Sequence, residues 1–492
     1  MILLQNGYLW QNGAFTKTKN TMRIDNDKIE QIYSDPTPIR ASAKGSIDLE
    51  GAYVYPGFTD THTHSFEGGL YALGVDLSRI CSIEELKERL SNAYLATTDA
   101  DPIFAWQFEE TAIVEKRFPL LAELDAVCPD KPLILRRIDG HSCMLNSFGR
   151  KLISHIVSTE AEVLRGKNND LAVHYFHGKL SEEAVIGAYH EAARIALKGG
   201  FTGVHTMIGD ADQSIAHYRL IRDNLGAFPI KYSIYPQSFN ISAALDAGAV
   251  RIGGCILADG SIGSATAAMK QPYQNSVARG ILYQSDEFWM EFIAEAHKHN
   301  LQVGVHCIGD RAITQINNVY KHLADTDYRD LRHQLIHCEL TDDALIAEIK
   351  ASGAVPVMQP NFDLLWGGES SLYDRMLGQN RSKNMNRFGS FTQNSVRITG
   401  SSDWYITPLD IVQSIHAAMH HHNPNERLTH SQAVDIYTTN AAWLIGEDSV
   451  SGAIEPGYSA DFTVLSHPLD DGHNTPKVLK VICNGAIVYE AT

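Results

Sequence analysis

Pro56-Gly57-Phe58-Thr59-Asp60-Thr61-His62-Thr63-His64 is the stretch that decides how the fold is interpreted, because it places two histidines one residue apart after an apolar run. Residues 51–58 are apolar and aromatic, which is typical of a strand that enters a core. Side chains two residues apart on a strand leave the same face, so His62 and His64 can reach one metal ion together. Such pairs also occur as ordinary surface or core residues, and the interpretation therefore depends on further ligands.

The composition limits the classes of partner. The net charge of −17 at pH 7 repels nucleic acid and anionic membrane surfaces. No apolar run reaches the ~18 residues that span a bilayer, and residues 1–7 lack the basic start and long apolar stretch of a signal peptide. The 7 cysteines are scattered and odd in number, which favours reduced thiols in the cytoplasm over a disulfide framework. We therefore expect a cytoplasmic protein with a small-molecule substrate, and neither nucleic acid nor membrane as a partner.

The chain is also rich in histidine, with 22 residues, and this supply favours metal chemistry. The run His420-His421-His422, however, has the pattern of a helix end. We expect its three side chains to be exposed to solvent rather than to bind metal.

Both ends of the chain carry the pattern of short strands. The dipeptides Asn6-Gly7 and Asn484-Gly485 each interrupt an apolar run, which is typical of a hairpin turn. Because one long middle separates the two ends, we expect residues 1–56 and 450–492 to pair into one composite β-sandwich domain. The strands expected there are the two halves of 2–10, then 22–24, 29–33, 460–465, 478–483 and 486–489.

The middle of the chain alternates short β-rich runs with helix patterns. Together with the strand before His62, the runs predict eight β/α repeats, and hence an α/β fold with a (β/α)8 TIM barrel. Helices are expected at 181–197, at 341–353 and from Thr429, which has capping-box spacing to Gln432. The other expected strands are 202–205, 231–235, 255–259, 301–306, 334–337, 354–358 and 395–400.

The repeat count requires a long insertion after the first strand. Residues 66–199, approximately, have a helix pattern of their own at 82–95 and strands near Phe104 and Leu133. Without them, residues 57–449 retain about 260 residues, close to the roughly 250 of a typical barrel of this class. We therefore expect a catalytic barrel over 57–449 that is interrupted by this insertion.

Further histidines and an aspartate stand at other strand ends. Chemistry in (β/α)8 barrels lies at the carboxyl ends of the strands, and the sequence places His306, His337 and Asp403 there. Each also has an ordinary structural interpretation, as a buried hydrogen-bonded histidine or as a helix cap. Considered jointly with His62 and His64, the set favours a metal centre.

These residues resemble the amidohydrolase superfamily of metal-dependent hydrolases, and the resemblance covers nearly the whole chain. It rests on residues 56–64, on His337 and on Gly400-Ser401-Ser402-Asp403, and residues 452–465 resemble the family's return into its β-sandwich. Further motifs resemble the branch called amidohydrolase family 3, which includes N-substituted formamide deformylases. They are Asp139-Gly140-His141-Ser142, Asp259-Gly260-Ser261 and His306-Cys307-Ile308-Gly309-Asp310-Arg311-Ala312.

The resemblance implies a hydrolase that cleaves an amide or other non-peptide C–N bond of a small molecule with metal-activated hydroxide. It implies zinc, with one or two ions per chain and two favoured. Asp403 is then both a ligand and the general base that returns a proton to the leaving nitrogen. The implied metal ligands are His62, His64, His306, His337 and Asp403.

Substrate contacts are less specific. The resemblance places the loop of His141 over the barrel mouth, where this histidine either binds substrate and stabilises an oxyanion or only supports the loop. Trp404, directly after the catalytic aspartate, is expected as a wall of the pocket. Trp106 and Phe362 are further candidates for that wall.

One position departs from the family pattern. Many binuclear members carry a carboxylated lysine near the start of strand four, and alignment backwards from Asp259-Gly260-Ser261 places Cys255 there. A thiolate is a strong zinc ligand that can bridge two ions, whereas most free cysteines are small core residues. We expect Cys255 to be a metal ligand; without it, the centre is mononuclear or bridged by another group. His205, at the end of strand two, is expected to shape the pocket.

Two other functions stay open. A mononuclear zinc deaminase of an amino-heterocycle would usually add a glutamate soon after the strand-five histidine, where Asp310 is the only nearby acid. A metal-free scaffold protein with the same barrel would typically have lost ligands that are all present here. Since the class is often oligomeric, a homo-oligomer stays open as well, and the substrate is not named by the sequence.

Overall fold

The computed structural model of the chain describes residues 2–34, 45–96, 101–137, 142–158, 161–209 and 215–491. The chain divides into two compact units. Unit 1 consists of Met1–His64 and Ala193–Thr492, and unit 2 consists of Ser65–Ala192. Unit 2 thus covers most of the stretch expected to be an insertion.

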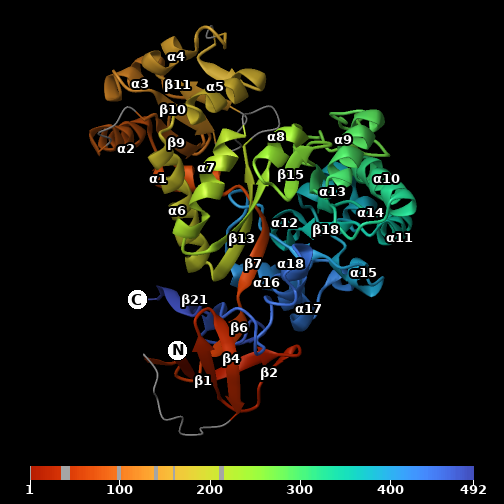
Figure 1. Ribbon diagram of the computed structural model, residues 1–492. Coiled ribbons are helices and arrows are strands. Elements are labelled where there is room, and N and C mark those ends of the chain that lie inside the picture. Colours follow the sequence, from red (N-terminus) through yellow and green to blue (C-terminus); the bar gives the residue numbers. More distant parts are fainter. Residues whose placement is uncertain are drawn as a thin grey trace. The chain divides into compact units, whose positions relative to one another are not determined.

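One sheet of unit 1 is built from both ends of the chain, seen in Figure 1 as red strands beside a blue one. Its strands are β1 (Ile2–Gln11), β2 (Ala14–Phe15), β3 (Asn20–Asp25), β4 (Lys28–Ser34), β5 (Ser46–Asp48), β6 (Tyr53–Pro56), β20 (Phe462–Leu465), β21 (Val478–Cys483) and β22 (Ala486–Glu490). The strand β6 joins the two ends. It pairs parallel to β1, with Tyr53 opposite Tyr8, and antiparallel to β20, with Val54 opposite Val464.

The N-terminal hairpin expected at Asn6-Gly7 is wrong. β1 runs through both residues as one strand, and its pairing with β3 shifts register between Leu4 and Gly7. Asn6 has a φ of 63°, so the dipeptide makes a bulge inside one strand rather than a turn between two. The C-terminal hairpin is confirmed, because β21 and β22 pair around Asn484-Gly485.

The middle of the chain forms two parallel sheets in unit 1, one ordered β14-β13-β7 and the other β15-β16-β17-β18-β19. Each strand expected there is present among the described residues, although β19 has only two residues. Their residues are almost all buried, as in parallel sheets covered on both faces. The strands are β7 (Phe58–Thr63), β13 (Phe201–Ile208), β14 (Lys231–Pro236), β15 (Arg251–Leu257), β16 (Gln302–Cys307), β17 (Gln334–His337), β18 (Val355–Met358) and β19 (Thr399–Gly400).

The carboxyl ends of β7 and β19 lie next to each other. The hydroxyl of Thr61 donates a hydrogen bond of 2.9 Å to the carbonyl of Gly400. Just beyond, Thr63 forms an isolated parallel bridge with Trp404. The residues that follow these two strands are therefore neighbours, although more than 300 residues of sequence separate them.

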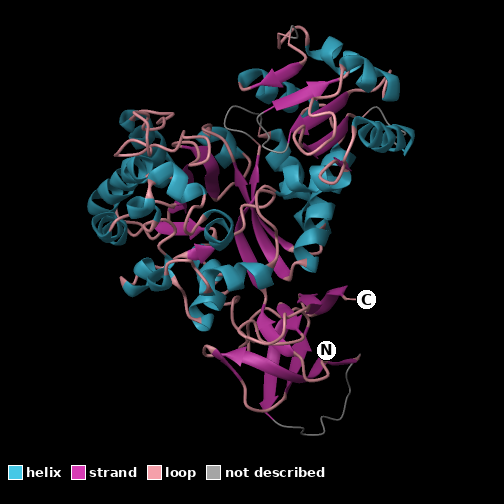
Figure 2. Ribbon diagram, turned by 180° about the vertical axis from the view of Figure 1, so that it is seen from behind, coloured by secondary structure: helices cyan, strands magenta, loops and turns pink. Residues whose placement is uncertain are grey.

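Helices follow the parallel strands, and Figure 2 shows them flanking the sheets. Those expected at 181–197, at 341–353 and from Thr429 are confirmed, and the last begins with the expected capping box to Gln432. No helix of the described segments is long and apolar enough to cross a bilayer. The helices are α6 (Glu182–Lys198), α7 (Ala216–Asn224), α8 (Ile241–Asp246), α9 (Asp286–Lys298), α10 (Asp310–Thr326), α11 (Asp343–Ser352), α12 (Pro360–Trp366), α13 (Leu372–Leu377), α14 (Gln379–Ser382), α15 (Phe388–Gln393), α16 (Ile411–Met419), α17 (His430–Asp435) and α18 (Thr439–Leu444).

Unit 2 has its own sheet, ordered β12-β11-β10-β9-β8, and its own core, which includes Leu86, Phe108 and Met144. The helix expected at 82–95 and the strands expected near Phe104 and Leu133 are confirmed as α2, β9 and β10. Its elements are α1 (Ser65–Leu73), β8 (Val75–Asp76), α2 (Ile83–Ala96), β9 (Ile103–Phe108), α3 (Leu121–Val127), β10 (Leu133–Arg137), β11 (Ser142–Leu145), α4 (Ser147–Ile153), β12 (Val163–Arg165) and α5 (Lys167–His177).

Candidate metal centre

His62 and His64 stand at the carboxyl end of β7, and a buried aspartate fixes the backbone that carries them. The carboxylate of Asp60 accepts hydrogen bonds from the backbone N–H groups of His62 (3.1 Å) and Ser402 (2.9 Å). Burial raises the pKa of Asp60 to about 7, although these hydrogen bonds oppose the rise. Asp60 was not expected at the site, and its only sequence signal is its place in the same motif.

Asp403 meets both histidines. Its Oδ1 lies 3.2 Å from Nε2 of His62 and 3.2 Å from Nε2 of His64. Burial on its own would raise the pKa of Asp403, but the contacts with the two imidazoles outweigh burial and hold the pKa far below its usual range. Asp403 also has a left-handed backbone, with φ of 55°, a strained conformation that is often found at functional sites.

His337 ends β17, and Gln359 fixes its ring. Nδ1 of His337 lies 2.9 Å from Oε1 of Gln359, whose side-chain amide donates to the hydroxyl of Ser401 at 2.9 Å. Because the amide oxygen only accepts, Nδ1 carries the proton and Nε2 keeps its lone pair for an ion. Burial lowers the pKa of His337, and the charge of His306 lowers it further, so the ring is neutral. Gln359 follows β18 directly but belongs to no motif, and sequence reasoning missed it.

His306 packs against His337, with ring centroids 4.4 Å apart. Its Nε2 lies 3.0 Å from the carbonyl of Gly260, so Nδ1 is the nitrogen left for an ion. Asp259 shapes this loop, because its buried carboxylate accepts the N–H groups of Ile308 (2.9 Å) and Gly309 (2.8 Å). Burial would lower the pKa of His306, but the Cys255 thiol and Asp259 raise it to about 9.

Cys255 is turned toward the histidines by a bulge in β15. The ladder with β16 pairs Gly253 with Gly304 and then Ile256 with Val305, so Gly254 and Cys255 are extra residues. Burial would raise the pKa of the Cys255 thiol, but the charge of His64 and the nearby imidazoles of His306 and His62 lower it well below its usual value. This lowering favours the thiolate, the state in which cysteine binds metal.

The side chains form two overlapping groups of metal-ligand atoms. One is His62, His64 and Cys255, the other is His62, His337 and Asp403, and within each group the ligand atoms lie within 4.8 Å of one another. Both nitrogens of His62, Nδ1 of His306 and Oδ1 of Asp403 are buried and have no hydrogen-bond partner among the described residues. Imidazole nitrogens, a thiolate and a carboxylate are the donors that zinc prefers, so the residues present fit a zinc centre.

Four further residues were expected near the site. His141 lies outside the described residues. Trp404 is buried, and its carbonyl accepts a hydrogen bond from the N–H of His64 at 2.5 Å. Phe362 stacks on His337, with centroids 5.8 Å apart and planes at 14°. Trp106 belongs to unit 2, where it stacks on Tyr71.

His205 is fully buried and lies outside both ligand groups. Its Nδ1 lies 3.1 Å from the hydroxyl of Tyr235, and its carbonyl accepts the hydroxyl of Thr63 at 2.8 Å. Burial lowers the pKa of His205 well below its usual value, so the ring is neutral. His205 belongs to β13, and these two hydrogen bonds hold it against Tyr235 of β14 and Thr63 of β7.

The histidine run after α16 corrects one expectation. His420 is exposed, but His421 is fully buried. The chain turns back after α16 toward α12, where Asp363 lies 3.0 Å from Nε2 of His421 and in closer contact with Nδ1 of His422. The run was expected to be solvated because the sequence does not show which element packs over the end of the helix.

Known proteins resemble this chain over nearly its whole length. A family model described as amidohydrolase family matches residues 46–489. The putative amidohydrolase YtcJ of Bacillus subtilis is 26% identical and covers 98% of this chain and 99% of its own. An N-substituted formamide deformylase of Arthrobacter pascens is 23% identical, over 94% of this chain and 93% of its own. The solved structure of an uncharacterized metal-dependent hydrolase from Pyrococcus furiosus has a TM-score of 0.81 at 22% identity, over 95% of this chain and 100% of that one.

Proposed function

The chain belongs to the amidohydrolase family, and we propose that it is a metal-dependent hydrolase that cleaves an amide or other non-peptide C–N bond of a small molecule. One observation carries the proposal. Two groups of ligand atoms share His62. Several of these atoms, on His62 and Asp403, are buried and have no hydrogen-bond partner among the described residues. Unpaired buried polar atoms are costly, and a pair of metal ions would satisfy them.

We assign two zinc ions to the centre. His62, His64 and Cys255 would hold one ion, with His306 beside the thiolate, and His337 and Asp403 would hold the other. Because His306 also lies near the Cys255 thiol, the thiolate could reach the second ion too and would then bridge the two, as a carboxylated lysine does in related sites. Zinc, when bound, supplies a water of lowered pKa as a nucleophile at neutral pH and polarises the substrate carbonyl.

Asp403 is the group that moves the proton. Its pKa lies far below the usual range, so it is ionised at neutral pH, and its Oδ1 has no hydrogen-bond partner among the described residues. It accepts the proton of the attacking water and then delivers it to the leaving nitrogen. Asp60 supports this role by holding the N–H of Ser402, the residue just before Asp403.

Substrate binding is assigned to Trp404 and His141. Trp404 stands next to Asp403 and is buried, which suits a wall against an apolar acyl or N-substituent. His141 is assigned from its sequence motif alone, as a hydrogen-bond donor to the carbonyl oxygen. The relative named N-substituted formamide deformylase makes N-substituted formamides the first substrates to test.

The finer architecture is part of the proposal. The two parallel sheets would form one (β/α)8 barrel over residues 57–449, since contacts between Thr61 and Gly400 already join the ends of β7 and β19. The sheet shared by residues 1–56 and 450–492 would be a composite β-sandwich. All 7 cysteines are unpaired, which supports a reducing compartment such as the cytoplasm.

The test is an activity screen of zinc-loaded protein against N-formyl, N-acyl and cyclic amides, with amino-purines, amino-pyrimidines and dipeptides as separate arms. We expect hydrolysis of one amide class, and a loss of about 10³-fold or more in kcat for Asp403→Asn. Release of ammonia from an amino-heterocycle alone, or cleavage of dipeptides alone, would overturn the assigned bond. Less than ~0.2 equivalents of any transition metal in purified protein, where a zinc centre calls for one or two, would point to a scaffold instead.

A further inference from the structure

A second cluster of metal-ligand side chains lies apart from the catalytic groups. Asp363 of α12 faces His421 and His422, which follow α16. Oδ1 of Asp363 lies 3.0 Å from Nε2 of His421 and closer still to Nδ1 of His422. The three ligand atoms lie within 4.8 Å of one another, and none belongs to either catalytic group.

The three atoms approach without forming hydrogen bonds. Oδ1 of Asp363, Nε2 of His421 and Nδ1 of His422 are buried and have no hydrogen-bond partner among the described residues. The catalytic pair of His62 and Asp403 has the same arrangement, at 3.2 Å. Buried donor atoms without hydrogen bonds are costly, and an ion bound by all three would satisfy them.

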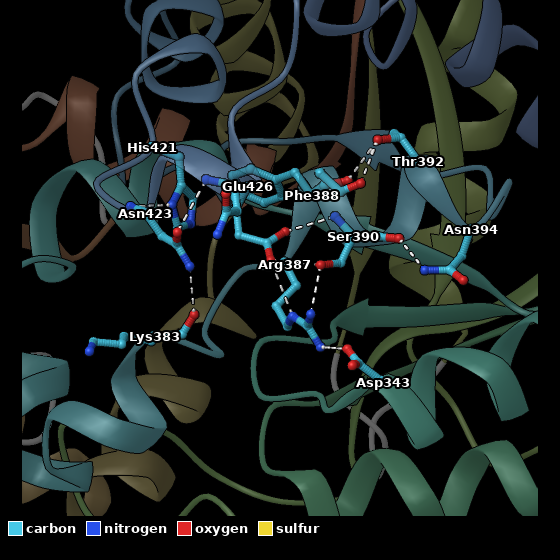
Figure 3. Close-up of polar contacts among 12 residues, drawn as sticks. Asp343, Lys383, Arg387, Phe388, Ser390, Thr392, Asn394, His421, Asn423 and Glu426 are labelled. Carbon is cyan, nitrogen blue, oxygen red and sulfur yellow. Dashed lines mark hydrogen bonds and ion pairs between the residues drawn. The ribbon is translucent and has the colours of Figure 1, made fainter.

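The segment that carries the two histidines is held rigidly. Oδ2 of Asp363 accepts the N–H of His422 at 3.0 Å, and the carbonyl of His421 accepts Nε of Arg427 at 2.8 Å. Behind it, the buried Glu426 accepts hydrogen bonds from the N–H and the hydroxyl of Ser390 and forms an ion pair with Arg387 (Figure 3). The ligand atoms are therefore fixed before any ion arrives, which lowers the cost of binding.

The cluster lies at the edge of the buried region, and glycine is required beside it. The side chain of His422 is 26% exposed, whereas those of His421 and Asp363 are buried. Gly367, which follows α12, packs directly against two of the ligand atoms. A Cβ on Gly367 would lie 2.5 Å from Oδ1 of Asp363 and 2.5 Å from Nδ1 of His422.

One contact must change on loading. The N–H of Asn423 donates to Nδ1 of His421 at 3.0 Å (Figure 3). An imidazole that binds an ion through Nε2 carries its proton on Nδ1, so this hydrogen bond opens when His421 becomes a ligand. Its loss costs about 1 kcal/mol, which is small beside the binding energy of a structural zinc ion.

We propose that Asp363, His421 and His422 form a second divalent metal site, separate from the catalytic centre, that takes zinc. Two imidazoles and a carboxylate are ligands typical of zinc and leave positions open for water. The site stands one residue from Phe362, whose ring stacks on His337 of the catalytic centre. An ion there would tie α12 to the segment after α16 and hold that wall in place.

Metal analysis tests the proposal. Protein is saturated with zinc, passed through a desalting column and measured for zinc per chain. We expect His422→Ala and Asp363→Asn each to hold one ion fewer than the natural chain, with zinc affinity at the site at least 10–100-fold weaker. The matched control His420→Ala, an exposed histidine in the same run, should keep the full content. The double variant His62→Ala/His337→Ala should still hold one ion.

Equal zinc content in the natural chain and His422→Ala would overturn the proposal. A measurement on the natural chain makes the test independent of how the variants fold. Zinc should slow the acylation of His422 by diethyl pyrocarbonate, followed by peptide mass spectrometry, and leave that of His420 unchanged. Equal rates at His422 with and without zinc would contradict the site.

Discussion

Cys255 stands where the resemblance to binuclear amidohydrolases leads one to expect a carboxylated lysine. A carboxylated lysine must react with carbon dioxide before it can bridge, whereas a thiolate needs only a lowered pKa. Contacts with three histidines supply that lowering. Sulfur is also the softer donor, and it favours zinc over harder ions such as Mg²⁺ or Mn²⁺.

Replacement of Cys255 should remove one ion from the catalytic centre. In Cys255→Ala, we expect the zinc bound there to fall from two ions per chain to one, because His62 and His64 alone are a weak pair of ligands. Atomic absorption of purified protein measures the total zinc, which should fall by one ion per chain. Cys307→Ala is the matched control, since Cys307 is buried and belongs to neither ligand group. Unchanged zinc in Cys255→Ala would show that the thiol is only a core residue.

Gln359 should tune the affinity of His337 for zinc. In Gln359→Leu, Nδ1 of His337 loses its acceptor, and we expect zinc to bind 10–100-fold more weakly, as measured by competition with a chelator. Ser401→Ala removes the other side-chain partner of Gln359 and leaves the bond to His337 in place. If Ser401→Ala weakens zinc as much as Gln359→Leu does, the effect arises from packing rather than from the hydrogen bond.

The sequence predicts the candidate site residues that belong to recognisable motifs. It does not predict those whose role depends on which residues the fold brings next to them. His62 and Asp403 were predictable because they follow apolar runs at the spacing of barrel strands. Gln359 was not, because its role depends on which ring lies across the sheet. The burial of His421 depends on the packing of α12 against the end of α16, and a run of three histidines gives no sign of it.

At the scale of an element, the bulge in β15 places Cys255. Gly253 has a φ of 85°, and a Cβ there would lie 2.3 Å from the carbonyl oxygen of Gly304. Only glycine combines this backbone with so close a neighbouring strand. The strand could be predicted from its apolar residues, but the bulge could not, because it exists only against its partner β16.

Gly253→Ala should therefore cost more than conformational strain alone. We expect a loss of about 2–4 kcal/mol in the free energy of unfolding, from the left-handed backbone and the collision together, and a lower zinc content as Cys255 moves. Gly248→Ala is the matched control, because Gly248 has a φ of 72° and nothing within 4 Å of its Cβ position. It should cost about 1 kcal/mol, as measured by urea denaturation. Equal losses in the two variants would mean that the close approach of β16 has no energetic effect.

The stability of the whole molecule should fall in acid because of His333, which is buried far from the metal ligands. Its Nδ1 accepts the N–H of Val303 (3.0 Å), and its Nε2 lies 2.9 Å from Nδ1 of His297. Burial, and then the charge of His297, lower the pKa of His333 to about 3, against 6.5 for a free histidine. Between these values the unfolded chain binds a proton that the folded chain does not, so stability is full above pH 6.5 and is lost as the pH falls toward 3.

The free energy of unfolding should thus drop by at most about 1.4 kcal/mol per pH unit below pH 6.5 from this residue. His333→Asn retains an acceptor for Val303 but does not titrate, and it should flatten the acid limb measured by urea denaturation at several pH values. His299→Asn, at an exposed histidine, should leave the limb unchanged. An acid limb of equal slope in the natural chain and His333→Asn would contradict the assignment.

The pairing of β6 with β20 joins residues from opposite ends of the chain, and this affects how the protein folds while it is being synthesised. Val54 is made early and pairs with Val464, which leaves the ribosome more than 400 residues later. At 5–20 residues per second, the first strands wait for tens of seconds with an unpaired edge. During that time β6 is an exposed apolar strand, and its aromatic residues Tyr53 and Tyr55 can pair with other chains. Yield in the cell should therefore depend on chaperones that cover nascent strands, more than for a protein whose first strands find all their partners early in the sequence.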